Sequence, residues 1–533
     1  MVRIIPTCSA LALLLAASVP PAAAAARTGD LAAYLRARAA DADGRGKVAV
    51  ENYAAALAAE PDSPLIAIRA YREGIAAGDG ALVRRAAAVL RRADVSPMDA
   101  PLFPLADAVR ANDPAAARAA LAALNEDRLK LLTPALTGWI ALAEGRDGPA
   151  AIEAAGGDAA ARRLSGESRA LLLLATGKLD EGLAAVRALG GGEIGGFRTA
   201  AAEILIGADR AKDAAELLDG DAFALAAARA GATARPGMAW GVSRLLLRVA
   251  DDMGGDQPSS VALALARAAL DADPNYARAH FVLAEQLGRS GDLSRAVAQL
   301  DAVPADGPLG PAAAGRRVDL LSRQDKLADA LAAARVLAEA EDARPLDQAR
   351  YADLLFADDR PAEALPWYER VLDEGQTKKN WAAWLRYGGA LDEAGRWKEA
   401  LRALDRAVKL GPEEPSALNY LGYTLVDRGE DVARGTRLLE RAHALDRNDP
   451  AIADSLGWAY YRAGDTARAL PLIEGAAAEA PGDAEIAEHL GDLYWTLGRR
   501  YEARYQWRAA AVTAPDAAAA RLRAKLESGL PAS

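Results

Sequence analysis

A small residue recurs along the C-terminal half of the chain at a nearly constant spacing. From residue 262 onwards, intervals of 34 to 36 residues separate Ala262, Ala296, Ala330, Ala364, Ala400, Gly435, Ala469 and Ala503. Twelve residues after these eight positions, proline occurs five times, at Pro274, Pro308, Pro412, Pro481 and Pro515. With 27 prolines in 533 residues, chance would place fewer than one there. This period indicates stacked repeats rather than a series of globular domains.

The last repeats share a second pattern around a glycine. Gly388, Gly457 and Gly491 each precede a larger apolar residue by three positions and a small residue by twelve. This pattern resembles the tetratricopeptide repeat (TPR), whose 34-residue unit is a helix–turn–helix. Small residues let the two helices approach closely, and proline ends the second helix because it has no N–H to donate. The resemblance implies an all-α fold, a right-handed superhelical TPR solenoid of helix–turn–helix repeats.

The composition agrees with an all-α fold. Hydrophobic residues make up 52% of the chain and aromatic residues only 5%, and alanine fills much of the difference. Alanine has the highest helix propensity, whereas the β-branched and aromatic residues that strands favour are comparatively few. A fold based on a β-sheet is therefore unlikely to form from this sequence.

The regularity of the repeats suggests four segments. We expect a signal peptide at 1–26, degenerate TPR-like repeats at 27–240, a regular array at 241–515, and a capping helix with a tail at 516–533. A different all-α domain is the alternative for 64–240. In the capping helix, Arg521, Arg523 and Lys525 suit a face turned to solvent.

The N-terminus has the features of a secretory signal. Arg3 precedes an apolar stretch at 9–19, and small residues then lead to Ala26. We expect cleavage after Ala26, with an uncleaved anchor as the alternative. Cleavage would place the protein in the periplasm, with membrane association peripheral at most and attachment to the outer membrane left open. Cys8 precedes the apolar stretch, so it does not occupy the position of a lipid-attachment cysteine.

Charge and residue usage argue against several classes of function. The net charge is −10 and no basic block occurs, so nucleic acid is not an expected partner. Three His and one Cys leave little for a metal site, and we expect no metal and no cofactor. Residues 190–195 match G-x-G-x-x-G, but a helix rather than a strand precedes them, so we interpret them as a turn. An enzyme is not expected.

The TPR resemblance implies a concave groove lined by the first helix of each unit. Helical spacing places residues three and four apart on one face. In the last repeats this face is rich in aromatic, amide and acidic side chains, and it is the predicted partner-binding groove. Its residues are Asn419, Tyr423, Asp454, Trp458, Tyr461, Glu488, Asp492 and Trp495. Trp458 and Trp495 are expected to be exposed in the groove, with packing against the next helix as the alternative. The groove suits extended segments that carry apolar and basic residues.

Three runs, at 416–428, 454–462 and 488–495, are similar to the C-terminal repeats of Gram-negative envelope TPR proteins. One group of these consists of outer-membrane lipoproteins that bind a carboxyl-terminal processing protease and bring it to cell-wall hydrolases. The resemblance implies a non-catalytic periplasmic scaffold whose partner is a protein or peptide, such as an envelope protease or cell-wall enzyme. The chain departs from that group in lacking the lipid-attachment cysteine.

Two other functions remain open from the sequence. One is a component of envelope biogenesis, in polysaccharide export or outer-membrane assembly. The other is an enzyme with a site in 64–240, where acidic residues are plentiful but show no catalytic spacing.

Overall fold

The computed structural model describes residues 21–124, 128–189, 196–253, 255, 257–373, 375, 377–514 and 516–530. Most of the predicted signal peptide and the glycine-rich segment at 190–195 lie outside the described residues. The chain divides into two compact units, an N-terminal unit up to Asp329 and a C-terminal unit from Ala330. The predicted change from degenerate to regular repeats at residue 240 concerns the sequence pattern and stays a prediction.

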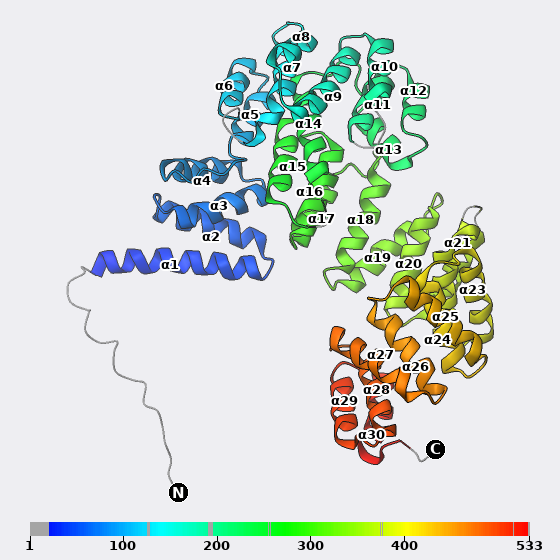
Figure 1. Ribbon diagram of the computed structural model, residues 1–533. Coiled ribbons are helices and arrows are strands. Elements are labelled where there is room, and N and C mark those ends of the chain that lie inside the picture. Colours follow the sequence, from blue (N-terminus) through cyan, green and yellow to red (C-terminus); the bar gives the residue numbers. More distant parts are fainter. Residues whose placement is uncertain are drawn as a thin grey trace. The chain divides into compact units, whose positions relative to one another are not determined.

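Every regular element within these ranges is helical, which confirms the all-α prediction (Figure 1). The α-helices of the N-terminal unit are α1 (Pro21–Ala42), α2 (Gly46–Ala59), α3 (Pro64–Ala77), α4 (Gly80–Arg92), α5 (Leu102–Arg110), α6 (Pro114–Leu124), α7 (Thr133–Ala143), α8 (Gly148–Ala155), α9 (Ala159–Ala175), α10 (Leu179–Leu189), α11 (Gly196–Gly207), α12 (Ala211–Leu217), α13 (Ala222–Ala230), α14 (Met238–Met253), α15 (Ser260–Ala272), α16 (Ala277–Arg289), α17 (Leu293–Asp301) and α18 (Gly310–Ser322). A 3-10 helix, η1 (Arg128–Leu132), precedes α7.

The C-terminal unit continues as helical hairpins. Its helices are α19 (Leu327–Ala338), which contains the boundary, α20 (Pro345–Ala357), α21 (Pro361–Asp373), the 3-10 helix η2 (Thr377–Lys379), α22 (Trp381–Glu393), α23 (Trp397–Leu410), α24 (Pro415–Asp427), α25 (Val432–Leu445), α26 (Pro450–Arg462), α27 (Thr466–Glu479), α28 (Ala484–Thr496), α29 (Arg500–Thr513) and α30 (Asp516–Ser528). Among the described residues, no helix is both long enough and apolar enough to cross a membrane.

Local sequence signals set the ends of the repeat helices. Asp449 and Asp483 each accept hydrogen bonds from two backbone N–H groups at the starts of α26 and α28, where these groups lack partners within the helix. Gly464 and Gly498 follow the same two helices with φ of 83° and 80°, a left-handed conformation that glycine adopts without strain. These signals recur in the regular repeats, which explains why the hairpins can be predicted from the sequence.

The close approach predicted for the two helices of one repeat is found between α24 and α25. A Cβ atom added to Gly435 would lie 2.7 Å from the backbone oxygen of Gly422. Only glycine fits there without movement of the backbone. The two small positions therefore set the distance between the helices of this repeat.

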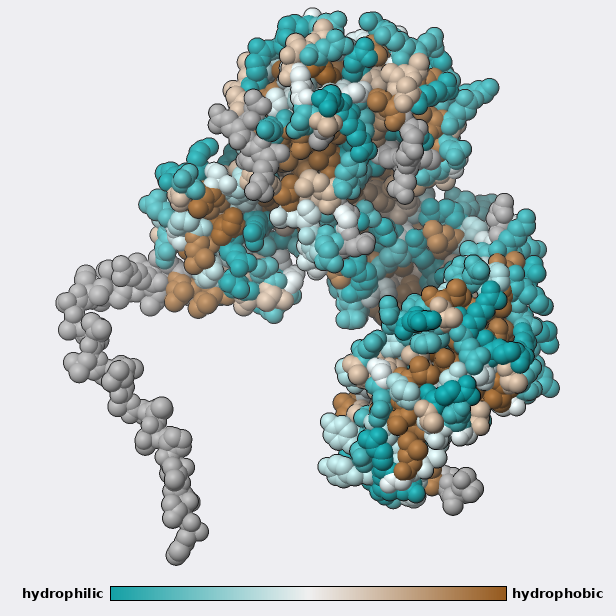
Figure 2. All heavy atoms as spheres, in the orientation of Figure 1, coloured by the Kyte–Doolittle hydropathy of each residue, from teal (hydrophilic) through white to brown (hydrophobic). Residues whose placement is uncertain are grey.

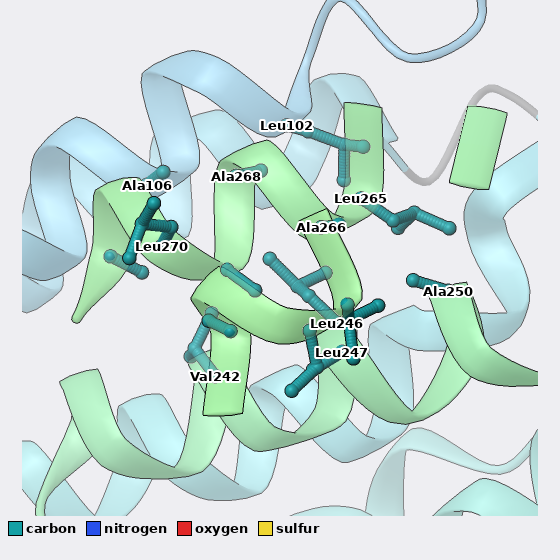
Figure 3. Packing of buried hydrophobic residues seen from close by; sticks show 14 of the residues in the cluster. Leu102, Ala106, Val242, Leu246, Leu247, Ala250, Leu265, Ala266, Ala268 and Leu270 are labelled. Carbon is teal, nitrogen blue, oxygen red and sulfur yellow. The ribbon is translucent and has the colours of Figure 1, made fainter. Parts of the chain in front are cut away.

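The N-terminal unit does not stack only on neighbours in sequence. Helices α14 and α15 pack against α5, more than 125 residues earlier in the chain (Figure 1). Figure 3 shows the buried side chains at this junction, Leu102 and Ala106 from α5, Val242, Leu246, Leu247 and Ala250 from α14, and Leu265, Ala266, Ala268 and Leu270 from α15. In a simple solenoid each repeat contacts only the repeats next to it in sequence. The N-terminal unit departs from that arrangement.

Polar contacts reinforce the junction between the early and late hairpins. Arg267 on α15 donates from Nε to the carbonyl oxygen of Ile75 (2.9 Å) and from Nη2 to that of Ala76 (3.1 Å). Both carbonyls lie at the C-terminal end of α3, where the helix dipole favours a cation. Deeper in the unit, fully buried Glu203 accepts from Trp240 Nε1 (2.9 Å) and the hydroxyl of Tyr276 (3.0 Å). The bonds of Arg267 thus hold α3 to α15, and the bonds of Glu203 hold α11 to α14 and to Tyr276.

The surface is mixed in character. Figure 2 shows hydrophobic side chains scattered among hydrophilic ones on the visible face. This distribution is ordinary for a folded protein, because polar residues are too few to cover a surface completely.

Candidate partner-binding face

The eight predicted groove residues lie on three first helices of consecutive repeats. Helix α24 carries Asn419 and Tyr423, α26 carries Asp454, Trp458 and Tyr461, and α28 carries Glu488, Asp492 and Trp495. Neighbouring helices of this set are in contact. We call the side of α24, α26 and α28 that carries these residues the partner face.

Contacts between helices bring most of these side chains together. The hydroxyl of Tyr423 donates to the carboxylate of Glu485 on α28, and the hydroxyls of Tyr461 and Thr496 are 3.0 Å apart. The ring of Trp458 stacks on Tyr461 with 5.0 Å between centroids. The aromatic residues of α24 and α26 thus both reach α28.

His489 is the central ring of this arrangement, and it is not one of the eight predicted groove residues. Its imidazole stacks on Trp458 with 4.0 Å between centroids and 15° between planes, and its centroid is 6.3 Å from that of Tyr423. The sequence favours a packing or surface role for each of the three His, and His489 is a packing residue. The helical spacing of Trp458 and His489 cannot reveal this stack, since the two residues lie on different helices.

The exposure expected for Trp458 is wrong. His489 and Tyr461 cover its ring, so that only 8% of the residue is exposed. The acidic residues Asp454, Glu488 and Asp492 are also buried. The half-buried residues, which still offer surface to a partner, are Asn419, Tyr423, Tyr461 and Trp495.

The buried carboxylates are already paired within the chain. Nδ1 of His489 lies 2.7 Å from Oδ2 of Asp454. Glu488 accepts two bonds from Arg521 (2.7 and 2.8 Å) and one from Lys525 (2.6 Å). Asp492 also accepts from Lys525, at 2.7 and 2.8 Å. Each buried charge therefore has the partner that its removal from water requires.

The expectation that α30 turns its basic residues to solvent is therefore wrong for Lys525. The Lys525 side chain is only 15% exposed, because its ammonium group lies between Glu488 and Asp492. Arg521 also bonds Glu488 but stays largely exposed. Arg523 is exposed, as predicted. The capping helix is thus joined to α28 by ion pairs, and its Leu522 is buried in the hydrophobic cluster of the last repeats.

The pKa values of the buried acids reflect these partners. For Glu488, burial disfavours the charge, but the bonds from Arg521 and Lys525 outweigh it and hold the pKa below its usual range. For Asp492, burial prevails over Lys525 and Trp507 and raises the pKa. The two neighbouring carboxylates therefore differ in proton affinity although they share one ammonium group.

The end of the chain covers Trp495. A Cβ atom added to Gly529, which has φ of 74°, would lie 1.7 Å from a ring carbon of Trp495. The guanidinium carbons of Arg500 and Arg504 lie 3.9 and 4.9 Å from the centroid of the same ring. Trp495 therefore packs against the chain's own C-terminal segment, although it is half-buried, as are Tyr423 and Tyr461.

Three covered polar atoms of the partner face have no hydrogen-bond partner among the described residues. They are Oδ1 of Asn419, Oδ1 of Asp454 and Nε1 of Trp458. Two of them are acceptors and one is a donor. All three atoms are shielded from water, so they do not face a partner that docks on this surface, and their lack of a hydrogen bond costs free energy.

In the described ranges, no group of three or more His, Cys, Asp or Glu side chains is arranged to hold a metal ion. The alternative of an enzyme stays open, and it concerned the acidic residues of 64–240. Their most deeply buried acid, Glu203, is bonded to Trp240, Arg244 and Tyr276, as expected for a structural group.

Comparison with known proteins identifies the repeats. Residues 366–510, which include all eight predicted groove residues, match a tetratricopeptide repeat family model, and residues 259–311 match a second one. A TPR repeat-containing protein of Pseudomonas aeruginosa is 49% identical over 53 residues, which is 10% of this chain and 9% of that protein. The chain thus spans only about a tenth of the length of this curated relative.

Solved structures also match this chain, at low sequence identity. A tetratricopeptide repeat protein from Parabacteroides merdae is 17% identical, with a TM-score of 0.40 over 47% of this chain and 97% of that one. The Cut9–Hcn1 complex of the APC/C is 14% identical, with a TM-score of 0.41 over 94% of this chain and 96% of that one. On the strength of the two family models, the chain contains tetratricopeptide repeats at 259–311 and 366–510.

Proposed function

We propose that this chain is a non-catalytic scaffold that binds a protein or peptide segment on the partner face of α24, α26 and α28. The observation that carries the proposal is the half-buried Asn419, Tyr423 and Tyr461, which offer polar and aromatic surface on the adjacent helices α24 and α26. A polypeptide backbone supplies N–H and C=O groups together, and its side chains can pack on the aromatic rings.

The surroundings of Tyr423 indicate the chemistry of the partner. Burial raises the pKa of Tyr423, and the carboxylates of Glu485, Asp427 and Asp454 raise it further. Asp427 lies 3.7 Å from Arg462, and Asp454 bonds His489. Glu485, which accepts from the Tyr423 hydroxyl, therefore supplies the negative charge at this end of the face. At the other end, Glu488 and Asp492 are already neutralised by α30. We expect a segment with apolar side chains whose basic residue lies near Tyr423.

Binding of short peptides to the full chain tests this function. Fluorescence anisotropy would compare extended peptides that combine leucine with lysine, leucine with glutamate, or leucine with serine. Tyr461→Ala should weaken the best peptide at least about fivefold, as expected for an aromatic contact residue. Tyr505→Ala is the matched control, since Tyr505 is 63% exposed on α29. Equal affinity for all three peptides, or equal losses in both variants, would contradict the assignment.

We also propose that the scaffold acts in the periplasm, with an envelope protease or a cell-wall enzyme as its partner. The support is the signal-like N-terminus and the similarity of 416–428, 454–462 and 488–495 to envelope TPR adaptors. Intact-mass analysis of the protein from a Gram-negative host would detect cleavage near Ala26. Crosslinking in the envelope fraction, with wild type and Tyr461→Ala compared, would identify a partner whose recovery depends on the partner face.

A further inference from the structure

Helix α29 carries the most exposed large hydrophobic side chains in the part of the chain that the structure describes. Val512 is 82% exposed and Tyr501 is 81% exposed, and Tyr505 on the same helix is 63% exposed. Arg508 is exposed as well. Intervals of four, three and four residues place these side chains on one side of the helix. We call Tyr501, Tyr505, Arg508 and Val512 the outer line of α29.

The opposite side of α29 belongs to the core and fixes the orientation of the outer line. Ala503, Trp507 and Ala510 are fully buried, and Nε1 of Trp507 donates to Asp492 on α28 (2.9 Å). The helix contacts both α28 and α30 (Figure 1). The outer line therefore cannot turn inward without loss of this packing.

The two preceding repeats have no such line. At the equivalent positions, α27 carries Ala467, Pro471, Glu474 and Ala478, and α25 carries Ala433, Arg437, Glu440 and Ala444. The carboxylates of Glu474 and Glu440 accept from the hydroxyls of Tyr494 (2.7 Å) and Tyr460 (3.0 Å), each on the next helix. Stacking of the repeats thus uses small residues and an acid here, so it does not account for the two rings and the guanidinium group of α29.

Positive charge exceeds negative charge on α29. Its one acid, Glu502, shares Arg499 with Glu474, at 3.1 and 3.2 Å, and this group keeps one negative charge. The helix also contains three arginines that pair with no carboxylate among the described residues, Arg500, Arg504 and Arg508.

The adjacent helix α30 does not cancel this excess. The ion pairs described above neutralise its Arg521 and Lys525, and exposed Arg523 and Glu527 carry opposite charges. The described side chains around the outer line are thus positive on balance, in a chain whose net charge is −10. A negatively charged partner is favoured at this surface.

The exposure of the outer line decides between two kinds of negatively charged partner. Residues that bind a polypeptide strongly lie in well-packed pockets, whereas these side chains project from a single helix. An anionic bilayer accepts side chains that project. Tyrosine rings lie at the level of the headgroups, an aliphatic side chain reaches the boundary with the acyl chains, and arginine pairs with lipid phosphate. The composition of the outer line fits the bilayer.

We propose that the outer line of α29 docks the C-terminal unit on the surface of an anionic lipid bilayer. Tyr501 and Tyr505 enter the headgroup region, Val512 reaches the boundary with the acyl chains, and Arg508 binds lipid phosphate. The helix lies along the surface and does not cross the bilayer. This contact does not rest on the proposed function, because the partner face consists of other residues.

Sedimentation of the full chain with vesicles tests the proposal. The protein should bind vesicles of phosphatidylcholine and phosphatidylglycerol in equal parts, and it should bind phosphatidylcholine alone about fivefold more weakly or less. High salt should weaken binding to the charged vesicles, since it screens the charges. Soluble poly-glutamate offers negative charge without a bilayer. If it binds as tightly as the charged vesicles and depends on the same tyrosines, the partner is an acidic polypeptide and the proposal is overturned.

Substitutions on α29 localise the contact. The double variant Tyr501→Ser/Tyr505→Ser should weaken binding to the charged vesicles about tenfold, because two rings leave the headgroup region. Arg508→Gln should weaken it about fivefold, the scale for one basic residue at an anionic surface. Every variant keeps the same N-terminus, so the apolar stretch at 9–19 contributes equally to all.

Two variants elsewhere are the matched controls. Val336→Ser removes a valine that is 70% exposed on α19. Arg437→Gln removes an exposed arginine on α25, at the position equivalent to Tyr505. Both should bind charged vesicles like the wild type. Thermal unfolding followed by circular dichroism verifies that each variant is folded.

A fluorescent label on the helix gives a second readout. In a Cys8→Ser background, Val512→Cys and Val336→Cys each provide one exposed thiol for an environment-sensitive fluorophore. Emission from position 512 should shift to the blue on charged vesicles, and emission from position 336 should not. The proposal is also overturned if charged and neutral vesicles bind equally, if the folded tyrosine and Arg508→Gln variants bind like the wild type, or if both labels respond alike.

Discussion

Nδ1 of His489 lies 2.7 Å from Oδ2 of Asp454, and both side chains are buried at the centre of the partner face. The pair joins α28 to α26 while Trp458 stacks on the imidazole. Burial alone would lower the pKa of His489, but the charge and hydrogen bond of Asp454, followed by the charges of Glu485 and Asp492, raise it above 6.5. The groups around the imidazole thus favour its charged form.

The first prediction concerns the pH dependence of the C-terminal unit. A group whose pKa is higher in the folded state stabilises the protein fully below its unfolded pKa, and this contribution is lost as the pH rises through the folded pKa. The free energy of unfolding should therefore decrease as the pH rises above 6.5. His489→Gln should remove this decrease. Urea unfolding at a series of pH values, followed by tryptophan fluorescence, measures it.

His443→Gln on α25 is the matched control, and it should keep the pH dependence of the wild type. The prediction fails if the free energy of unfolding of the wild type does not change as the pH rises above 6.5. It also fails if His489→Gln shows the same dependence on pH as the wild type, because the pair with Asp454 would then not bind the proton more tightly in the folded state.

The second prediction concerns the attachment of α30. Lys525→Met leaves Asp492 and Glu488 with fewer donors in a largely buried place. We expect a loss of about 2 kcal/mol in the free energy of unfolding and faster proteolytic release of α30. Arg523→Met should change the stability by less than about 0.5 kcal/mol, because Arg523 is exposed. Equal protease sensitivity of the two variants would argue against a role of the ion pairs.

The third prediction tests the packing inside the N-terminal unit. A Cβ atom added to Gly241 on α14 would lie 1.9 Å from the ring of Trp139 on α7. Gly241→Ala should therefore destabilise the unit by about 2 kcal/mol or more, through overpacking. Gly166→Ala on α9 should instead stabilise it by about 0.5–1 kcal/mol, since its nearest contact would be an ordinary 3.5 Å. Chemical denaturation of both variants measures the difference, and a stabilised Gly241→Ala would contradict this packing.

The repeat pattern predicts the parts of the fold that depend on local signals. Helices α15, α23 and α27 end at Ala272, Leu410 and Glu479, in each case two residues before a proline of the 34-residue pattern. Helical spacing likewise places the predicted groove residues on α24, α26 and α28. A proline or a glycine acts within its own turn, so its effect is visible in the sequence around it.

Contacts between distant residues account for what the sequence does not predict. His489 covers Trp458, and Lys525 points inward to Asp492. The two residues of each contact lie about 30 positions apart in the sequence and on different helices. The packing of Leu102 near Leu265 spans more than 160 residues and follows no period (Figure 3). Periodicity gives the orientation of a side chain on its helix, but the neighbour that it meets is set by how the helices pack.

The last prediction concerns Arg267, which fastens α15 to the end of α3. Burial lowers the pKa of this guanidinium group, so its place in the interior depends on the two carbonyl oxygens that it bonds. Arg267→Met keeps much of the apolar stem but leaves the carbonyl oxygen of Ala76 without this donor. We expect a loss of about 2–3 kcal/mol in stability, the range for bonds to a charged group. Hydrogen exchange should also accelerate in the last turn of α3. Arg91→Met is the control, because Arg91 is exposed on α4, and it should affect neither measurement. If Arg267→Met keeps the wild-type exchange rate, the apolar contacts between α5 and α15 are sufficient to hold the early and late hairpins together.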